Sequence, residues 1–129
     1  MDQVLQRILY VEDEPDIQAV ARLSLEHIGG FTVEVCSSGR EALEKLPQFK
    51  PDLILLDVMM PDMDGPTTLQ ALRTTPEGST VPVAFMTAKV QPQEIAQYKL
   101  LGAIDVIPKP FDPMTLADKV RAIWGQRHG

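Results

Sequence analysis

Residues able to do phosphoryl chemistry follow four separate apolar runs of this chain. The acidic pair Glu12 and Asp13 follows one run, and Asp57 ends another. Thr87 and Lys109 come at the ends of two more. Three carboxylates in one crevice would repel one another, and a divalent cation that prefers oxygen ligands, such as Mg²⁺, relieves that repulsion. If the fold brings these residues together, they suit a phosphoryl-transfer site.

Each residue has a distinct chemical role in such a site. Asp57 can attack phosphorus as a nucleophile and become an aspartyl phosphate. Lys109 can supply a cation, and the Thr87 hydroxyl can donate a hydrogen bond to a phosphoryl oxygen. Taken singly, these residue types more often serve as strand-end caps, helix starts or solvated surface groups. Their convergence at one edge of a sheet is what favours a site.

The composition predicts one soluble globular domain. The chain has 129 residues, of which 44% are hydrophobic and 23% charged. Lys and Arg number 12 against 18 Asp and Glu, a formal net charge of −6. This acidic balance opposes attraction to nucleic acid and to anionic membranes, so we expect no direct binding to either.

Cysteine usage and the N-terminus indicate a cytoplasmic protein. A single cysteine, Cys36, cannot form an intramolecular disulfide, and it lies in an apolar run that suits a small buried side chain. The longest apolar runs are far shorter than the ~20 residues of a membrane-spanning helix. The start Met1-Asp2-Gln3 also lacks the basic and apolar stretches of a signal peptide.

Strand and helix patterns alternate five times along the chain. Apolar or alternating runs predict strands at residues 7–11, 32–36, 52–57, 81–86 and 104–107. Helices are expected from Pro15 to the stop at Gly29-Gly30, before Pro47, around Leu69–Leu72, over Pro92–Leu101 and over Pro113–Trp124. In the first and last helices the predicted core stripes are Ile17, Val20, Ala21, Leu25 and Ile28, and Leu116, Val120, Ile123 and Trp124.

This alternation predicts an α/β fold with a doubly wound, five-stranded parallel sheet. The common strand order is 2-1-3-4-5, the flavodoxin-like (βα)5 arrangement. Pro108, which has no backbone donor, suits the edge position that this order gives to the fifth strand. Ligands bind such sheets outside the carboxyl ends of the strands, where the five residues singled out above would meet.

Four segments resemble the receiver domain of two-component response regulators. They are residues 8–14 (ILYVEDE), 55–65 (LLDVMMPDMDG), 86–88 (MTA) and 109–111 (KPF). Together they span the whole chain, in the order and at the spacing of that family. The resemblance implies that Asp57 is the phosphoacceptor in a phosphorelay, and that the bond between Lys109 and Pro110 is cis.

The same resemblance implies a ligand set and a responding set of residues. Asp13, Asp57 and the backbone carbonyl of Met59 would ligate Mg²⁺, for which Mn²⁺ can substitute, and Glu12 would act directly or through water. Lys109 would pair with the phosphoryl group and Thr87 would follow it inward. The small Ala88 would let its backbone amide approach.

The resemblance further implies a signalling switch that catalyses only its own phosphorylation and dephosphorylation. A sensor histidine kinase or a histidine phosphotransfer protein would donate the phosphoryl group, and a downstream protein would bind in response through helix 4, strand 5 and helix 5. We expect one receiver domain over residues 1–129, with a core of about 6–125, no output domain, and a monomeric or weakly dimeric state. A stand-alone receiver is favoured slightly over one cut from a larger regulator.

One position departs from the family pattern. Relatives often carry Tyr or Phe three residues before the lysine, as a rotamer switch coupled to the threonine, and this chain has Val106. We therefore expect the signal to travel through Thr87, the loop 88–91 and the fourth helix rather than through a ring flip.

Two other classes of protein share an aspartate nucleophile or this fold, and the residues fit both of them less well. Phosphohydrolases of the haloacid-dehalogenase type need a second acid two residues after the nucleophile, where this chain has Met59. A flavodoxin-like flavin carrier needs a glycine- and hydroxyl-rich phosphate cradle after the first strand. The residues there are Glu12, Asp13 and Glu14, which would repel a flavin phosphate.

Overall fold

The computed structural model describes residues 4–126, so both ends of the predicted 1–129 domain lie outside the described residues. Within residues 4–126, five strands form one parallel sheet in the order β2-β1-β3-β4-β5, which confirms the predicted topology. The strands are β1 (Arg7–Val11), β2 (Thr32–Cys36), β3 (Leu53–Asp57), β4 (Val83–Thr87) and β5 (Asp105–Pro108).

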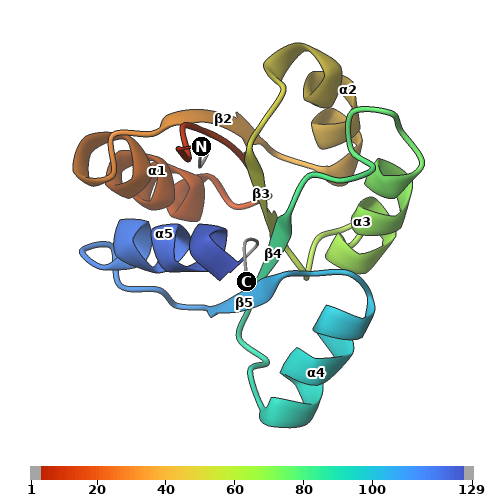
Figure 1. Cartoon of the computed structure of the whole chain (residues 1–129). Coiled ribbons are helices and arrows are strands. Elements are labelled where there is room, and N and C mark those ends of the chain that lie inside the picture. The colour runs from red at the N-terminus through yellow and green to blue at the C-terminus, as the bar shows by residue number, and fades with distance from the viewer. Residues whose placement is uncertain (1–3, 127–129) are drawn as a thin grey trace.

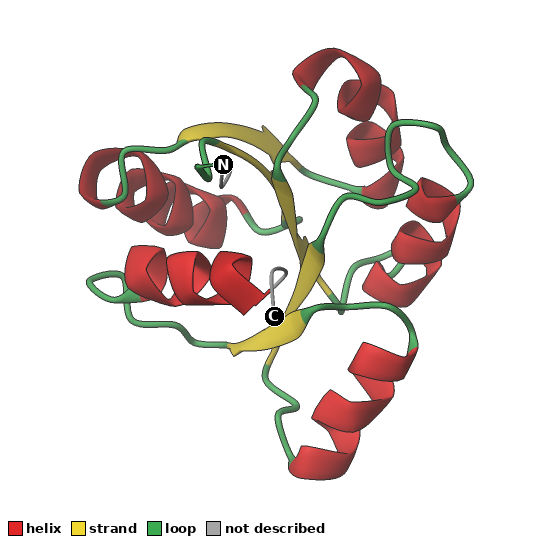
Figure 2. Cartoon of the chain, in the orientation of Figure 1, coloured by secondary structure: helices red, strands yellow, loops and turns green. Residues whose placement is uncertain are grey.

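Helices cover both faces of the sheet (Figures 1 and 2). Helices α1 and α5 lie on one face, and α2, α3 and α4 lie on the other. Their bounds are α1 (Pro15–Leu23), α2 (Gly39–Phe49), α3 (Gly65–Arg73), α4 (Pro92–Leu100) and α5 (Leu116–Gln126), with a π-helical segment η1 (Ser24–Ile28) continuing α1.

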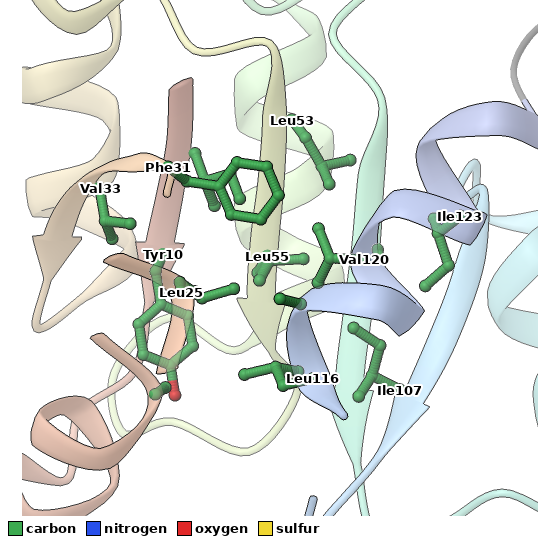
Figure 3. Close-up of a cluster of buried hydrophobic side chains, with 14 of the residues drawn as sticks. Tyr10, Leu25, Phe31, Val33, Leu53, Leu55, Ile107, Leu116, Val120 and Ile123 are labelled. Carbon is green, nitrogen blue, oxygen red and sulfur yellow. The ribbon is translucent and has the colours of Figure 1, made fainter. Parts of the chain in front are cut away.

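The buried core is divided between the two faces of the sheet. Figure 3 shows the cluster beneath α1 and α5, where Tyr10, Leu55 and Ile107 from three strands meet Leu116 and Val120 of α5. Every residue of β3 is buried, as expected for a central parallel strand covered on both sides. The predicted stripe of α5 is confirmed: Leu116, Val120, Ile123 and Trp124 are all buried.

The predicted stripe of the first helix is wrong at two positions. Val20 and Ile28 have exposed fractions of 44% and 48%, while Ser24 is buried. Ile28 ends the π-helical segment, whose wider turn rotates the residues that follow away from the 3.6-residue period on which the stripe was based. Val20 instead borders a surface pocket that also includes Pro110 and Phe111.

Several element boundaries differ from their predictions near prolines. Helix α2 continues through Pro47 to Phe49 instead of stopping before the proline. Strand β4 begins at Val83, because the segment with Pro82 provides only a carbonyl, which accepts a hydrogen bond from Ile54 N at 3.0 Å. Helix α5 begins at Leu116, after a turn that starts at Pro113.

The topology places four strand ends side by side. Residues Val11, Leu56 and Phe85 are aligned in neighbouring strands, and Phe85 is aligned with Val106. The chain therefore leaves β1, β3, β4 and β5 at one edge of the sheet, where the predicted site residues lie. Within residues 4–126, no helix has the length and apolar character needed to cross a bilayer.

Candidate functional site

The acidic side chains come from the carboxyl ends of two adjacent central strands. Glu12 and Asp13 follow β1, and the Glu12 N–H donates to Cys36 O at 2.9 Å, extending the β1–β2 ladder into the loop. Asp57 is the last residue of β3 and only 2% exposed. Carboxylate oxygens of Glu12, Asp13 and Asp57 all lie within 4.8 Å of one another, so one cation can contact all three.

Lys109 joins this cluster from the far edge of the sheet. It directly follows β5, and its Nζ lies 3.0 Å from Glu12 Oε1 and 3.1 Å from Asp57 Oδ1. The second oxygen of Glu12, Oε2, accepts a hydrogen bond from Glu14 N at 3.2 Å. The peptide bond between Lys109 and Pro110 is cis, which confirms that prediction.

Burial and mutual repulsion shift the proton affinities of these groups. Burial raises the pKa of Glu12 above its usual range, and the charge of Asp57 adds to this while the Lys109 hydrogen bond opposes it. Burial likewise raises the pKa of Asp57, again opposed by Lys109. Burial alone would lower the pKa of Lys109, but its hydrogen bonds to Glu12 and Asp57 outweigh this and raise it. Three carboxylates therefore share one lysine, which leaves an excess of negative charge at the site.

Thr87 and Ala88 lie at the end of the neighbouring strand β4. Asp57 is aligned with Met86, so Thr87 is one residue further toward the carboxyl edge. The Thr87 side chain is buried, and its Oγ1 accepts a hydrogen bond from Lys89 N at 3.1 Å, which leaves the hydroxyl proton for another acceptor. Its carbonyl accepts from Lys109 N at 2.9 Å, while Ala88 is exposed.

The loop after β3 is folded tightly against the site. Gly65 N donates to Val58 O at 2.9 Å, and a Cβ placed on Gly65 would lie 2.7 Å from Asp57 O, so only glycine fits here without a backbone shift. Met59, two residues after Asp57 in this loop, is 69% exposed.

Sequence reasoning missed two residues next to the cluster. Tyr10 is fully buried in β1, and its hydroxyl is the only buried side-chain polar atom within residues 4–126 that lacks a hydrogen-bond partner. Burial, then the charges of Glu12 and Asp57, raise the pKa of this phenol. Gln18 in α1 hydrogen-bonds the backbone of the acidic loop. A tyrosine in an apolar run and a glutamine in a helix carry no sequence signal that would single them out.

A family model and the curated relatives of this chain indicate the same protein family. A family model of the response regulator receiver domain matches residues 8–121. The DNA-binding response regulator MtrA of Mycolicibacterium smegmatis is 37% identical over 122 residues, which are 95% of this chain and 52% of that protein. Response regulator MprA of Mycolicibacterium vanbaalenii is 38% identical over 117 residues, 91% of this chain and 49% of that protein. The chain thus spans about half the length of these curated relatives.

Solved structures agree with the sequence comparisons. The chemotaxis protein CheY4 of Vibrio cholerae has a TM-score of 0.84 and 30% sequence identity, covering 93% of this chain and 99% of that one. The receiver domain of a signal transduction histidine kinase from Syntrophus aciditrophicus has a TM-score of 0.76 and 35% identity, covering 93% and 90%. From the family match, the curated relatives and the shared fold, we conclude that this chain belongs to the response regulator receiver domain family of two-component signalling.

Proposed function

We propose that Asp57 accepts a phosphoryl group from a phosphohistidine donor in a Mg²⁺-dependent reaction, and that the product changes the binding of a protein partner. The observation that carries this proposal is the position of the Lys109 ammonium between Glu12 and Asp57, at 3.0 and 3.1 Å, in a cluster of three carboxylates. An acidic cluster with one built-in cation at the mouth of a parallel sheet suits an anion that arrives together with a metal ion.

The donor set fits Mg²⁺. Glu12, Asp13 and Asp57 offer only carboxylate oxygens, which this hard cation prefers over nitrogen or sulfur. We propose Asp13, Asp57 and the Met59 carbonyl as direct ligands, with Glu12 bound directly or through water and Mn²⁺ able to substitute. When bound, the cation neutralises charge that develops on the phosphoryl oxygens. The Lys109 ammonium already lies between Glu12 and Asp57, which supports the view that positive charge is stabilised here.

The transfer itself needs few protein groups. An Asp57 carboxylate oxygen attacks the phosphorus in line, the P–O bond forms as the P–N bond to the donor imidazole breaks, and the imidazole nitrogen keeps that electron pair and takes a proton. Lys109 Nζ, 3.1 Å from Asp57 Oδ1, then has the phosphoryl oxygens as new acceptors. In dephosphorylation, water attacks the phosphorus, the P–O bond to Asp57 breaks, and the carboxylate leaves with that electron pair. The domain thus acts as a switch that catalyses only its own phosphorylation and dephosphorylation.

The proposed response begins at Thr87 and Ala88. The phosphoryl group carries close to two negative charges in place of the single charge of the Asp57 carboxylate. These charges attract the free hydroxyl proton of Thr87 and the backbone N–H of Ala88. Thr87 ends β4 and Ala88 begins loop 88–91, which continues into α4. None of the residues of α4 is buried, so this helix is held less firmly than its neighbours.

Packing under α4 supports movement of that helix as a unit. Tyr98 of α4 packs edge-on against Phe85, with ring centroids 5.3 Å apart at 69°. Phe85 is aligned with Val106 of β5, the position where the family resemblance implies Tyr or Phe in many relatives. We therefore propose that α4, β5 and α5 form the surface whose partner affinity changes, with α4 as the part that moves.

A pocket beside the site supports docking of a donor protein. Ile17, Val20, Pro110 and Phe111 line an apolar hollow of about 280 Å³ that also reaches Lys109. A histidine kinase or a histidine phosphotransfer protein could seat apolar side chains there while presenting its phosphohistidine to Asp57. The net charge of −6 favours protein partners over direct contact with nucleic acid, and we propose that the domain works in the cytoplasm.

Beryllofluoride, a phosphoryl mimic, tests the proposal in solution. In ¹H–¹⁵N NMR spectra of the native chain, beryllofluoride with Mg²⁺ should shift the amides of Asp57, Thr87, Ala88 and the α4 residues, and should have no effect without Mg²⁺. Asp57→Asn should abolish the response. Asp62→Asn is the matched control, because Asp62 lies in the same loop with a φ of 68°, a conformation that asparagine also adopts. A native chain that ignores beryllofluoride would refute the proposal, and unchanged α4 amides would refute the switching part.

A further inference from the structure

We infer that Gln18 is a positioning residue that holds the backbone of the acidic loop and thereby sets the metal affinity of the site. The inference rests on the proposed binding of Mg²⁺ by Asp13 and Asp57. It goes beyond that proposal because Gln18 lies in α1, outside the ligand set, and acts only through the peptide groups of the loop.

Gln18 ties together two loops at the carboxyl edge of the sheet. Its Nε2 donates one hydrogen bond to the carbonyl of Glu12 and another to Ser37 Oγ at 3.1 Å. Glu12 belongs to the loop after β1, and Ser37 to the loop after β2. Gln18 N also donates to Glu14 O at 3.0 Å, a backbone hydrogen bond of the first turn of α1, so Gln18 stands one helical turn after the acidic loop.

The bond to the Glu12 carbonyl controls the direction of Asp13. That carbonyl belongs to the peptide plane that ends at Asp13 N, so fixing it fixes where the Asp13 side chain leaves the backbone. The Glu12 carboxylate is itself held by Lys109 Nζ at 3.0 Å and Glu14 N at 3.2 Å. Asp13 is less buried than Glu12 and Asp57, so packing constrains its side chain less than theirs.

Electrostatic repulsion makes such a constraint necessary. Three carboxylates within 4.8 Å of one another favour any backbone movement that separates them. Asp57 is held by a central strand that is buried at every position, whereas Asp13 follows β1 and is only half-buried, so Asp13 is the acid that the repulsion can displace more easily. The amide of Gln18 opposes that movement with an uncharged donor, which does not compete with a cation for the carboxylates as a lysine would.

Ser37, the second contact of Gln18, adjoins the capped start of α2. Ser37 N donates to Glu41 Oε1 at 2.6 Å, and Glu41 N donates to Ser38 Oγ at 3.0 Å. These two bonds cap the first turn of α2 and hold the backbone at Ser37. Gln18 therefore connects the acidic loop to the capped start of α2.

Gln18→Met keeps the length and helix propensity of the side chain and removes both donors. We expect the Mg²⁺ dissociation constant, measured by NMR titration of the whole chain, to rise about three- to tenfold, the range given by loss of one hydrogen bond of ordinary net strength. The ¹⁵N shift of the Asp13 amide should also change in the metal-free chain, since its nitrogen shares the peptide group of the Glu12 carbonyl. Gln18→Ala should behave in the same way.

Gln97→Met, on the exposed surface of α4, is the matched control and should leave Mg²⁺ affinity unchanged. A folded Gln18→Met chain that binds Mg²⁺ as tightly as the native chain would overturn the inference while leaving the proposed function intact. A native chain that gives no Mg²⁺ titration would instead overturn the proposed metal site and, with it, the role of Gln18.

Discussion

The Lys109 ammonium lies 3.1 Å from Asp57 Oδ1, although 52 residues separate the two in the chain. The contact spans β4, because Asp57 ends β3 and Lys109 follows β5. It places the proposed phosphoacceptor and the cation that would receive its phosphoryl oxygens in direct contact before any phosphoryl group arrives. The site is therefore preorganised by the parallel sheet rather than assembled on modification.

Removing this cation should weaken the fold and strengthen metal binding. Lys109→Met leaves two buried acids without their partner, so we expect the free energy of unfolding in EDTA to fall by about 2 kcal/mol. The uncompensated charge should bind Mg²⁺ more tightly, so added Mg²⁺ should restore more stability in the variant than in the native chain. Urea unfolding with and without Mg²⁺ measures both effects.

Lys99→Met is the control for that experiment. Lys99 Nζ lies 4.0 Å from Asp105 Oδ1 in a pair open to solvent, and such pairs contribute less than about 1 kcal/mol. If both variants lost the same free energy of unfolding, the contacts of Lys109 with Glu12 and Asp57 would contribute no more than an exposed ion pair.

The raised pKa values of Glu12 and Asp57 predict how stability depends on pH. Both carboxyls hold protons more tightly in the folded chain than in the unfolded chain, so their contribution favours folding at acid pH and is lost as pH rises through the raised values. Without Mg²⁺, the free energy of unfolding should therefore fall as the pH rises above about 4, the ordinary range of these carboxyls.

The matched chain for this measurement carries Glu12→Gln and Asp57→Asn together, and its pH dependence should be flatter. Saturating Mg²⁺ should also reduce the loss at high pH in the native chain, because the ion binds the ionised carboxylates. A native chain whose stability rises with pH, or changes as little as that of the double variant, would contradict the assigned direction.

The hydroxyl of Tyr10 predicts a stabilising substitution. This buried oxygen has no hydrogen-bond partner, so no hydrogen bond offsets the free energy lost when it is removed from water. Tyr10→Phe should raise the free energy of unfolding by about 1 kcal/mol, as measured by urea denaturation. Tyr98→Phe, at a half-buried position, should change it by less. A clear loss of stability in Tyr10→Phe would indicate that the phenol has a partner in solution.

The sequence allowed the fold to be predicted because the strands carry strong signals. The run from Asp52 to Asp57 has four apolar residues between two acids, and the strand formed there is buried at every position. Once the strand order was inferred, the rule that ligands bind at carboxyl ends brought Glu12, Asp57 and Lys109 together without any knowledge of their distances.

The features that escaped prediction depend on packing rather than on pattern. The π-helical turn at Ser24–Ile28 contains no residue type that announces it, and it left Ile28 outside the core. Helix α2 runs through Pro47, since tertiary contacts override the usual effect of proline. The hydrogen bond from Gln18 to the Glu12 carbonyl depends on how α1 is oriented relative to the loop before it, and the sequence pattern does not specify that orientation.

Intact-mass measurement after incubation with acetyl phosphate tests most directly whether Asp57 is the phosphoacceptor. The native chain and the Asp62→Asn control should each gain the mass of one phosphoryl group when Mg²⁺ is present and none when it is chelated. Asp57→Asn should gain none under either condition. The account would be contradicted if the native chain stayed unmodified with Mg²⁺, or if Asp57→Asn gained the same mass.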